Sequence, residues 1–186
     1  MTIKEIIKNS ATMLGREDIV KCIELNVDYQ TQVLKDSVST LTKLANLVIN
    51  ELACSFVPMS TVEEKTATGG KIYYTSLSNN PLKIIGVYDR NGNDVLKKIT
   101  ATFIMVSSND VLVEYSYFPK TFGIEESIGY QEKDVPMRVL CYGLCAEFAL
   151  SMGCYKDAVM WHGRYEDALV EFYKPSNSKI KRREWQ

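Results

Sequence analysis

The sequence predicts an α+β fold: a helical bundle, made of a long helix and a C-terminal αα-hairpin, carries an inserted small antiparallel β-sheet or barrel. Apolar residues recur at spacings of three and four in residues 33–56 and again in residues 134–173, which is typical of helices with one buried face. Between these two segments, short β-favouring runs alternate with turn signals such as Asn91-Gly92. The helical spacing thus gives way to β-favouring runs and then resumes, which predicts a β insert between helices.

Composition places the chain among ordinary globular proteins. With 186 residues and 46% hydrophobic content, it is long enough for one compact domain or one domain with an inserted subdomain. The formal net charge of -1 lacks the basic excess expected of a protein whose main task is to grip duplex DNA. No apolar run approaches the ~18 residues of a membrane helix, and residues 1–10 lack the apolar centre of a signal peptide. We therefore expect a cytoplasmic product with no membrane anchor.

The first 57 residues are predicted to be helical. Thr2 and Glu5 match a capping box, which starts a short helix that ends near Gly15. A second short helix follows at about residues 16–25, and residues 26–28 indicate a break with a new helix cap. The longest helix of the chain then runs through residues 33–56, and Pro58 ends it.

Residues 58–133 are interpreted as the β subdomain and an irregular crossing segment. The final run is the clearest strand, because Val111, Val113 and Tyr115 alternate with more polar neighbours. Strands are expected at residues 72–77, 83–88, 95–99, 102–106 and 111–118.

The αα-hairpin occupies residues 134–173 and is expected to pack on the N-terminal helices. Asp134-Val135-Pro136 reads as a helix start, with an oxygen-bearing cap and a proline where no N–H donor is needed. Gly153 is expected to close the first helix, and the second is expected to begin near Tyr155. Residues 174–186 lose all periodicity and form a basic tail, expected to be flexible when alone.

No enzyme motif appears in the sequence, so no catalytic residue and no cofactor are assigned. Cys141, Cys145, Cys154 and His162 have spacings from which a zinc site can be drawn, but no paired C-x-x-C motif accompanies them. We interpret the cysteines as buried reduced thiols and assign no metal. His162, the one histidine of the chain, is expected at a packing or rim position.

The adjacent acidic pairs, such as Glu63-Glu64, are also interpreted structurally. Neighbouring side chains on a strand or helix point apart, so such a pair is not by itself an acid/base dyad. We expect these carboxylates to be solvated.

The basic tail leaves three alternatives open: a solvated end, a docking peptide that orders on a partner protein, or a weak contact to a polyanion. An indole anchors well in a protein pocket, which favours docking. The residues concerned are Lys179, Lys181, Arg182, Arg183 and Trp185.

The order of the packing motifs resembles a phage structural protein. Residues 44–53 (LANLVINELA) precede the β insert, and residues 138–148 (RVLCYGLCAEF) and 161–169 (WHGRYEDAL) follow it. This layout is similar to that of head-to-tail adaptor proteins of tailed bacteriophages, of the tail tubular protein A type. The resemblance covers about residues 28–173.

The resemblance implies a homo-oligomeric ring of about twelve subunits beneath the portal protein. In such rings the helices surround a channel through which genomic DNA passes without specific contacts, and tail or nozzle proteins follow below. It implies portal docking by residues 179–185 and ring contacts by the helix faces of residues 35–56 and 137–173. The residues chosen for the ring contacts are Lys35, Lys43, Glu51, Arg164 and Glu166. The protein is then expected in the neck or tail of the virion, after synthesis in the bacterial cytoplasm.

Two alternatives accompany this expectation. The first is another component of the phage neck, a head-completion or tail-terminator protein. The second is a small nucleic-acid-binding module that uses the β insert as a stacking platform, which a lack of interleaved basic residues disfavours. The stacking residues would be Tyr73, Tyr74, Tyr88, Tyr115 and Tyr117.

Overall fold

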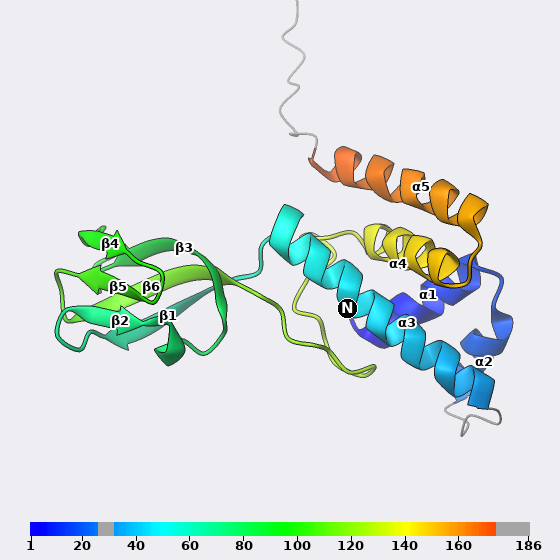
Figure 1. The fold of residues 1–186 in the computed structure, drawn as a ribbon, viewed down its shortest axis with the longest axis horizontal. Helices are drawn as coiled ribbons and strands as arrows, with labels where there is room; N and C mark the ends of the chain where they lie inside the picture. Colours follow the sequence, from blue (N-terminus) through cyan, green and yellow to red (C-terminus); the bar gives the residue numbers. More distant parts are fainter. Residues whose placement is uncertain (26–31, 174–186) are drawn as a thin grey trace, which may run out of the picture. The chain divides into compact units, whose positions relative to one another are not determined.

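A computed structural model describes residues 1–25 and 32–173 and shows an α+β protein (Figure 1). Within this part of the chain, five α-helices and two small antiparallel sheets are formed, which confirms the predicted α+β class. The described residues divide into two compact units: residues 1–45 together with those from Ile124 onward, and residues 46–123. One boundary therefore falls inside the long helix, rather than between residues 57 and 58.

Helix α1 (Ile3–Met13) begins with the expected capping box. Thr2 Oγ1 accepts from the Glu5 N–H at 3.2 Å, and Glu5 Oε2 accepts from the Thr2 N–H at 2.8 Å. The backbone turns at Gly15, whose φ of 69° suits glycine. Helix α2 (Glu17–Leu25) follows. The break predicted at residues 26–28 lies outside the described residues.

Helix α3 (Gln32–Glu51) is the long helix expected from the sequence. Its end widens into one π-helical stretch, Leu52–Phe56, and the Val57 N–H closes it on Leu52 O at 2.7 Å. In the second unit, the Asn46 side chain holds the crossing segment: Asn46 Oδ1 accepts from the Phe122 N–H at 2.7 Å, and Asn46 Nδ2 donates to Phe122 O at 3.0 Å. This pair of bonds fixes the crossing segment where it leaves the β strands.

Helices α4 (Met137–Ser151) and α5 (Tyr155–Tyr173) form the predicted hairpin (Figure 1). Gly153, with a φ of 74°, makes the turn between them. The predicted start is wrong in detail, because Pro136 is the N-cap and makes no side-chain cap bond. Glu132 Oε1 accepts from the Met137 N–H at 3.1 Å, whereas Asp134 Oδ2 accepts from the Gln131 N–H at 3.2 Å. The cap function thus comes from a residue further upstream.

Small residues allow α4 and α5 to pack closely. Their shared cluster consists of Cys145, Ala146, Ala149, Ala158 and Trp161. Helix α4 also packs on α1, where Ser10 Oγ donates to Cys141 O at 3.4 Å inside the core. The amphipathic α5 therefore covers one side of α4, while α1 contacts α4 as well.

The second unit contains two three-stranded sheets rather than one sheet or barrel. One has the order β1-β6-β3 and the other the order β2-β5-β4. Their inward side chains form one core that includes Ile72, Val87, Ile104, Val113 and Tyr115. The strands are β1 (Ser60–Thr66), β2 (Lys71–Tyr73), β3 (Pro81–Tyr88), β4 (Lys97–Ile99), β5 (Phe103–Val106) and β6 (Asp110–Tyr117).

Strand β1 is the element that the sequence does not reveal. Its residues STVEEKT include one large apolar side chain, Val62, and none of them is fully buried. An edge strand of this kind lacks the apolar alternation by which strands are recognised. The predicted strand 72–77 is also shorter than expected, because a 3-10 turn, Tyr74–Ser76, follows β2.

None of the described helices is both long enough and apolar enough to span a membrane.

Candidate functional site

The outward side of α5 presents an apolar surface next to solvent. Val159 is 74% exposed and Val170 58% exposed, and Met160 and Tyr155 are exposed as well. The opposite side of the helix is buried through Ala158, Trp161 and Tyr165. We call Val159, Met160, Gly163 and Val170 the outer face of α5.

Gly163 lies within this outer face, and among residues 1–25 and 32–173 no neighbour packs over it. A Cβ atom built on Gly163 meets nothing within 4 Å. Glycine inside a helix costs about 1 kcal/mol relative to alanine, and no close neighbour or positive φ in the described chain requires it here. The residue therefore leaves a shallow site on the helix, over which another backbone can approach closely.

The residues chosen for ring contacts are all exposed. Lys35 and Lys43 lie on the first part of α3, and Arg164 and Glu166 lie on α5, so these four belong to the same unit. Glu51 ends α3 in the other unit.

Arg164 and Glu166 also have contacts within their own chain. The Arg164 guanidinium lies 4.7 Å from the centre of the Trp161 ring, a cation–π contact on α5. Glu166 Oε1 lies 3.4 Å from His162 Nε2. The side chain of His162 is 57% exposed, which places it on the rim of the helix.

The residues chosen for portal docking cannot be placed. Lys179, Lys181, Arg182, Arg183 and Trp185 lie outside the described residues. Their assignment stays a prediction from the sequence.

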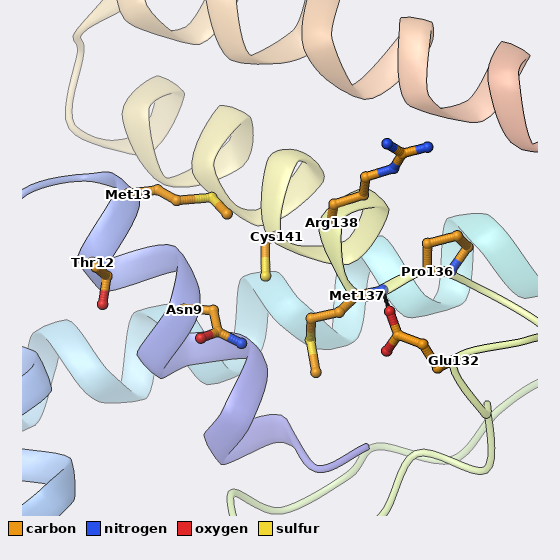
Figure 2. A pocket seen from close by; sticks show the side chains of 8 residues that line it. All are labelled: Asn9, Thr12, Met13, Glu132, Pro136, Met137, Arg138 and Cys141. Carbon is orange, nitrogen blue, oxygen red and sulfur yellow. Dashed lines mark hydrogen bonds between the residues drawn. The ribbon is translucent and has the colours of Figure 1, made fainter.

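An open pocket of about 520 Å³ lies between α1 and the start of α4 (Figure 2). Met13 and Met137 provide apolar walls, while Glu132 and Arg138 provide charge at its edge. Arg138 Nη2 is also held by Glu171 Oε2 of α5 at 2.9 Å. The other lining residues are Asn9, Thr12, Pro136 and Cys141.

The buried thiols have no nucleophilic character at neutral pH. Burial raises the pKa of Cys141 to about 11 and that of Cys145 to about 12, so both stay protonated. The interpretation of buried reduced cysteines is confirmed for these two residues. It is wrong for Cys154, which is exposed in the turn between α4 and α5. Cys22 and Cys54 are half-buried.

Within residues 1–25 and 32–173, no group of three or more His, Cys, Asp or Glu side chains is arranged to hold a metal ion. The carboxylate neighbour of His162 on the helix, Glu166, has a side chain that is 66% exposed.

The acidic pair in β1 differs from expectation. Glu64 pairs with Arg90 at 2.8 Å on the surface, but the side chain of Glu63 is only 15% exposed. Glu63 accepts hydrogen bonds from Tyr115 Oη, from Lys65 Nζ at 2.9 Å and from the Ser78 N–H at 3.2 Å. The prediction of a solvated Glu63 is wrong, because alternation on β1 directs it toward β6 and the turn before β3.

The five tyrosines proposed as a stacking platform do not share a surface. Tyr115 is fully buried, Tyr74 Oη donates to Thr100 O at 2.7 Å, and Tyr88 Oη donates to Glu114 Oε2 at 3.1 Å. Tyr117 is half-buried and packs edge-on against Tyr115 at 6.4 Å. Of these five tyrosines, Tyr73 alone is exposed, with 47% of its surface accessible.

Comparison with known proteins yields no match, either to a protein-family model or to a curated protein.

Proposed function

We propose that this chain is a structural virion protein of a tailed bacteriophage, a non-enzymatic head-to-tail adaptor. In this proposal, copies of the chain assemble into a closed ring that joins the portal to the tail. Genomic DNA passes through the ring without specific contacts, and tail or nozzle proteins bind on the side away from the portal.

The observation that supports this proposal most is the outer face of α5. Val159 and Val170 expose most of their apolar area, and Gly163 leaves room for a close neighbour that the described part of the chain does not supply. Covering exposed apolar side chains stabilises an assembly by about 25 cal/mol per Å². A helix from an adjacent subunit, packed over Gly163, would gain this burial energy. The gain would offset the destabilisation that glycine causes within the helix.

Charge indicates which helix of the neighbour would fit. Glu166 and Asp167 lie exposed on α5, and Lys35 and Lys43 lie exposed on α3. A contact that places Lys35 and Lys43 of one subunit's α3 beside Glu166 and Asp167 of the next subunit's α5 joins unlike charges, and repetition of such a contact closes a ring when the rotation permits. The ring contacts predicted from the sequence then become the charged border of an apolar helix contact.

The test measures the mass of the full-length chain, alone and mixed with the portal of the same phage, by native mass spectrometry and electron microscopy. We expect a ring on the portal, and we expect Val159→Asp to prevent it. Leu96→Asp is the matched control, because Leu96 is 84% exposed and belongs to the other compact unit, residues 46–123.

A chain that stays monomeric and ignores the portal contradicts the proposal. If Val159→Asp and Leu96→Asp have equal effects on ring formation, the outer face of α5 is not the contact between subunits. A ring that binds the tail but not the portal would instead identify a different neck component, such as a tail-terminator protein.

A further inference from the structure

The small sheet β2-β5-β4 has an outward surface that combines aromatic and basic side chains. Pairing places Lys71 opposite Met105, Tyr73 opposite Phe103, and Lys98 opposite Met105. Directly paired residues of neighbouring strands point to the same face. Ile72 and Ile104, which alternate with them, are buried on the inner face. We call Lys71, Tyr73, Lys98, Phe103 and Met105 the outer face of the small sheet.

Contacts made by two aromatic side chains organise this outer face. Tyr73 and Phe103 pack edge to face with ring centres 5.8 Å apart, and Lys71 Nζ lies 4.9 Å from the centre of the Phe103 ring. Phe103 thereby contacts both Tyr73 and Lys71. Tyr73 keeps 47% of its surface exposed and Met105 keeps 43%. A flat aromatic surface thus lies open beside a fixed cation.

The charge of the three strands has a single sign. Their residues include Lys71, Lys97 and Lys98 and no Asp or Glu. Lys97 lies 3.9 Å from Asp94 and belongs to the other side of β4. Lys71 and Lys98 therefore make the outer face locally cationic, although the chain as a whole has a net charge of -1.

We propose that the outer face of the small sheet binds single-stranded nucleic acid. One base stacks on Tyr73, and the two phosphates that flank this base meet Lys71 and Lys98, which lie in one row across the sheet with Met105 between them. A single strand fits better than a duplex because its bases can leave the stack and lie on an aromatic ring. The Asp and Glu side chains of an acidic peptide supply anions but no planar ring for Tyr73, whereas every nucleotide supplies both. This proposal goes beyond the adaptor role and does not depend on it.

The test is fluorescence anisotropy of the full-length chain with a labelled oligo(dT) strand. Two phosphate contacts predict that the logarithm of the binding constant falls against the logarithm of salt concentration with a slope of about −1.4. Tyr73→Ala is expected to weaken binding about fivefold or more, because it removes one base stack. Tyr73→Phe retains the ring and is expected to bind as the unmodified chain does.

Lys98→Glu is expected to weaken binding and to reduce the salt slope. Its matched control is Lys83→Glu, which makes the same charge change at an exposed position of β3 in the other sheet. The proposal is overturned if the unmodified chain does not bind oligo(dT), if Tyr73→Ala binds equally well, or if both lysine variants weaken binding to the same extent. Displacement of the oligonucleotide by polyglutamate, with no effect of Tyr73→Ala, would assign the face to an acidic protein instead.

Discussion

Tyr115 donates its phenolic hydroxyl to the Glu63 carboxylate inside the β unit. Tyr115 is fully buried on β6, and Glu63 reaches it from β1, the neighbouring edge strand. Lys65, Ser78 and the Asn79 N–H complete the network around the two groups. The edge strand, which has no fully buried residue of its own, is thus attached to the sheet through a charged hydrogen bond.

Tyr115→Phe is expected to loosen β1 from β6. The substitution removes a hydrogen bond to a charged group, which contributes about 1.5–3 kcal/mol, and leaves the ring in the core. Hydrogen exchange of the amides in β1 and β6 measures the change. Tyr155→Phe, on the exposed surface of α5, is the control. Unchanged protection of β1 would show that backbone pairing alone holds this strand.

Acid is expected to weaken the β unit through Glu63. Burial opposes the charged form of Glu63, but hydrogen bonds from Tyr115, Lys65 and Ser78 outweigh it and lower its pKa to about 2 from an ordinary 4.5. Because the folded pKa is the lower one, the stabilisation is complete above about pH 4.5 and is lost as the pH falls toward 2. The free energy of unfolding of the β unit should therefore fall by up to about 3 kcal/mol over this window.

Glu63→Gln separates this effect from general acid denaturation. Glutamine does not titrate, so the variant should be less stable than the unmodified chain at pH 7 and should lose less stability between pH 4.5 and 2. Urea unfolding at several pH values supplies the comparison. Parallel pH profiles for the two proteins would contradict a titrating role of Glu63.

Thiol labelling is expected to distinguish the cysteines by burial. Cys154 is exposed, whereas burial raises the pKa values of Cys141 and Cys145 to about 11 and 12. A maleimide reagent at pH 7 should modify Cys154 first and reach Cys141 and Cys145 only after unfolding, as peptide mass mapping can show. Cys154→Ser should abolish the fast phase. Rapid modification of Cys141 in the folded protein would indicate that α1 and α4 separate.

A charge exchange tests the neighbour proposed for α5. Lys43→Glu alone is expected to weaken ring assembly, because it places a carboxylate near the acidic residues of the adjacent α5. Combination with Glu166→Lys should restore assembly, as read by native mass spectrometry. Lys83→Glu, which has the same charge change in the β unit, serves as the control. Failure of the double variant to recover would exclude the pairing of α3 with α5.

Removal of residues 179–186 tests the proposed docking of the tail. The truncated chain should keep its helix content by circular dichroism and its ring contacts, because the contacts proposed on α3 and α5 lie outside the removed segment. Attachment to the portal in a pull-down experiment should fall. A second variant, Trp185→Ala, separates loss of the indole from loss of the basic charges. Full attachment of the truncated chain would show that portal binding lies elsewhere.

Periodicity was enough to predict the helices and most strands. The capping box at Thr2, the long helix through Phe56 and the turn at Gly153 follow from short-range chemistry, since caps, apolar spacing and glycine at positive φ act within a few residues. Strand β1 was missed because its partners are distant in sequence: Glu63 lies opposite Val113 in the register of β6. No local pattern in residues 60–66 indicates that this polar segment pairs with a strand about fifty residues further along the chain.

The sequence by itself determined the α+β class, the order of the helices around the β insert and the burial of Cys141 and Cys145, because each depends on local spacing and hydrophobicity. Only the tertiary structure decided which side chains share a surface. It buried Tyr115, paired Glu63 with it, and placed Lys71, Tyr73 and Lys98 together on one sheet face. It also left Gly163 uncovered on the outer face of α5. Surfaces depend on register and on packing between distant segments, and these are properties of the folded chain rather than of any single stretch of it.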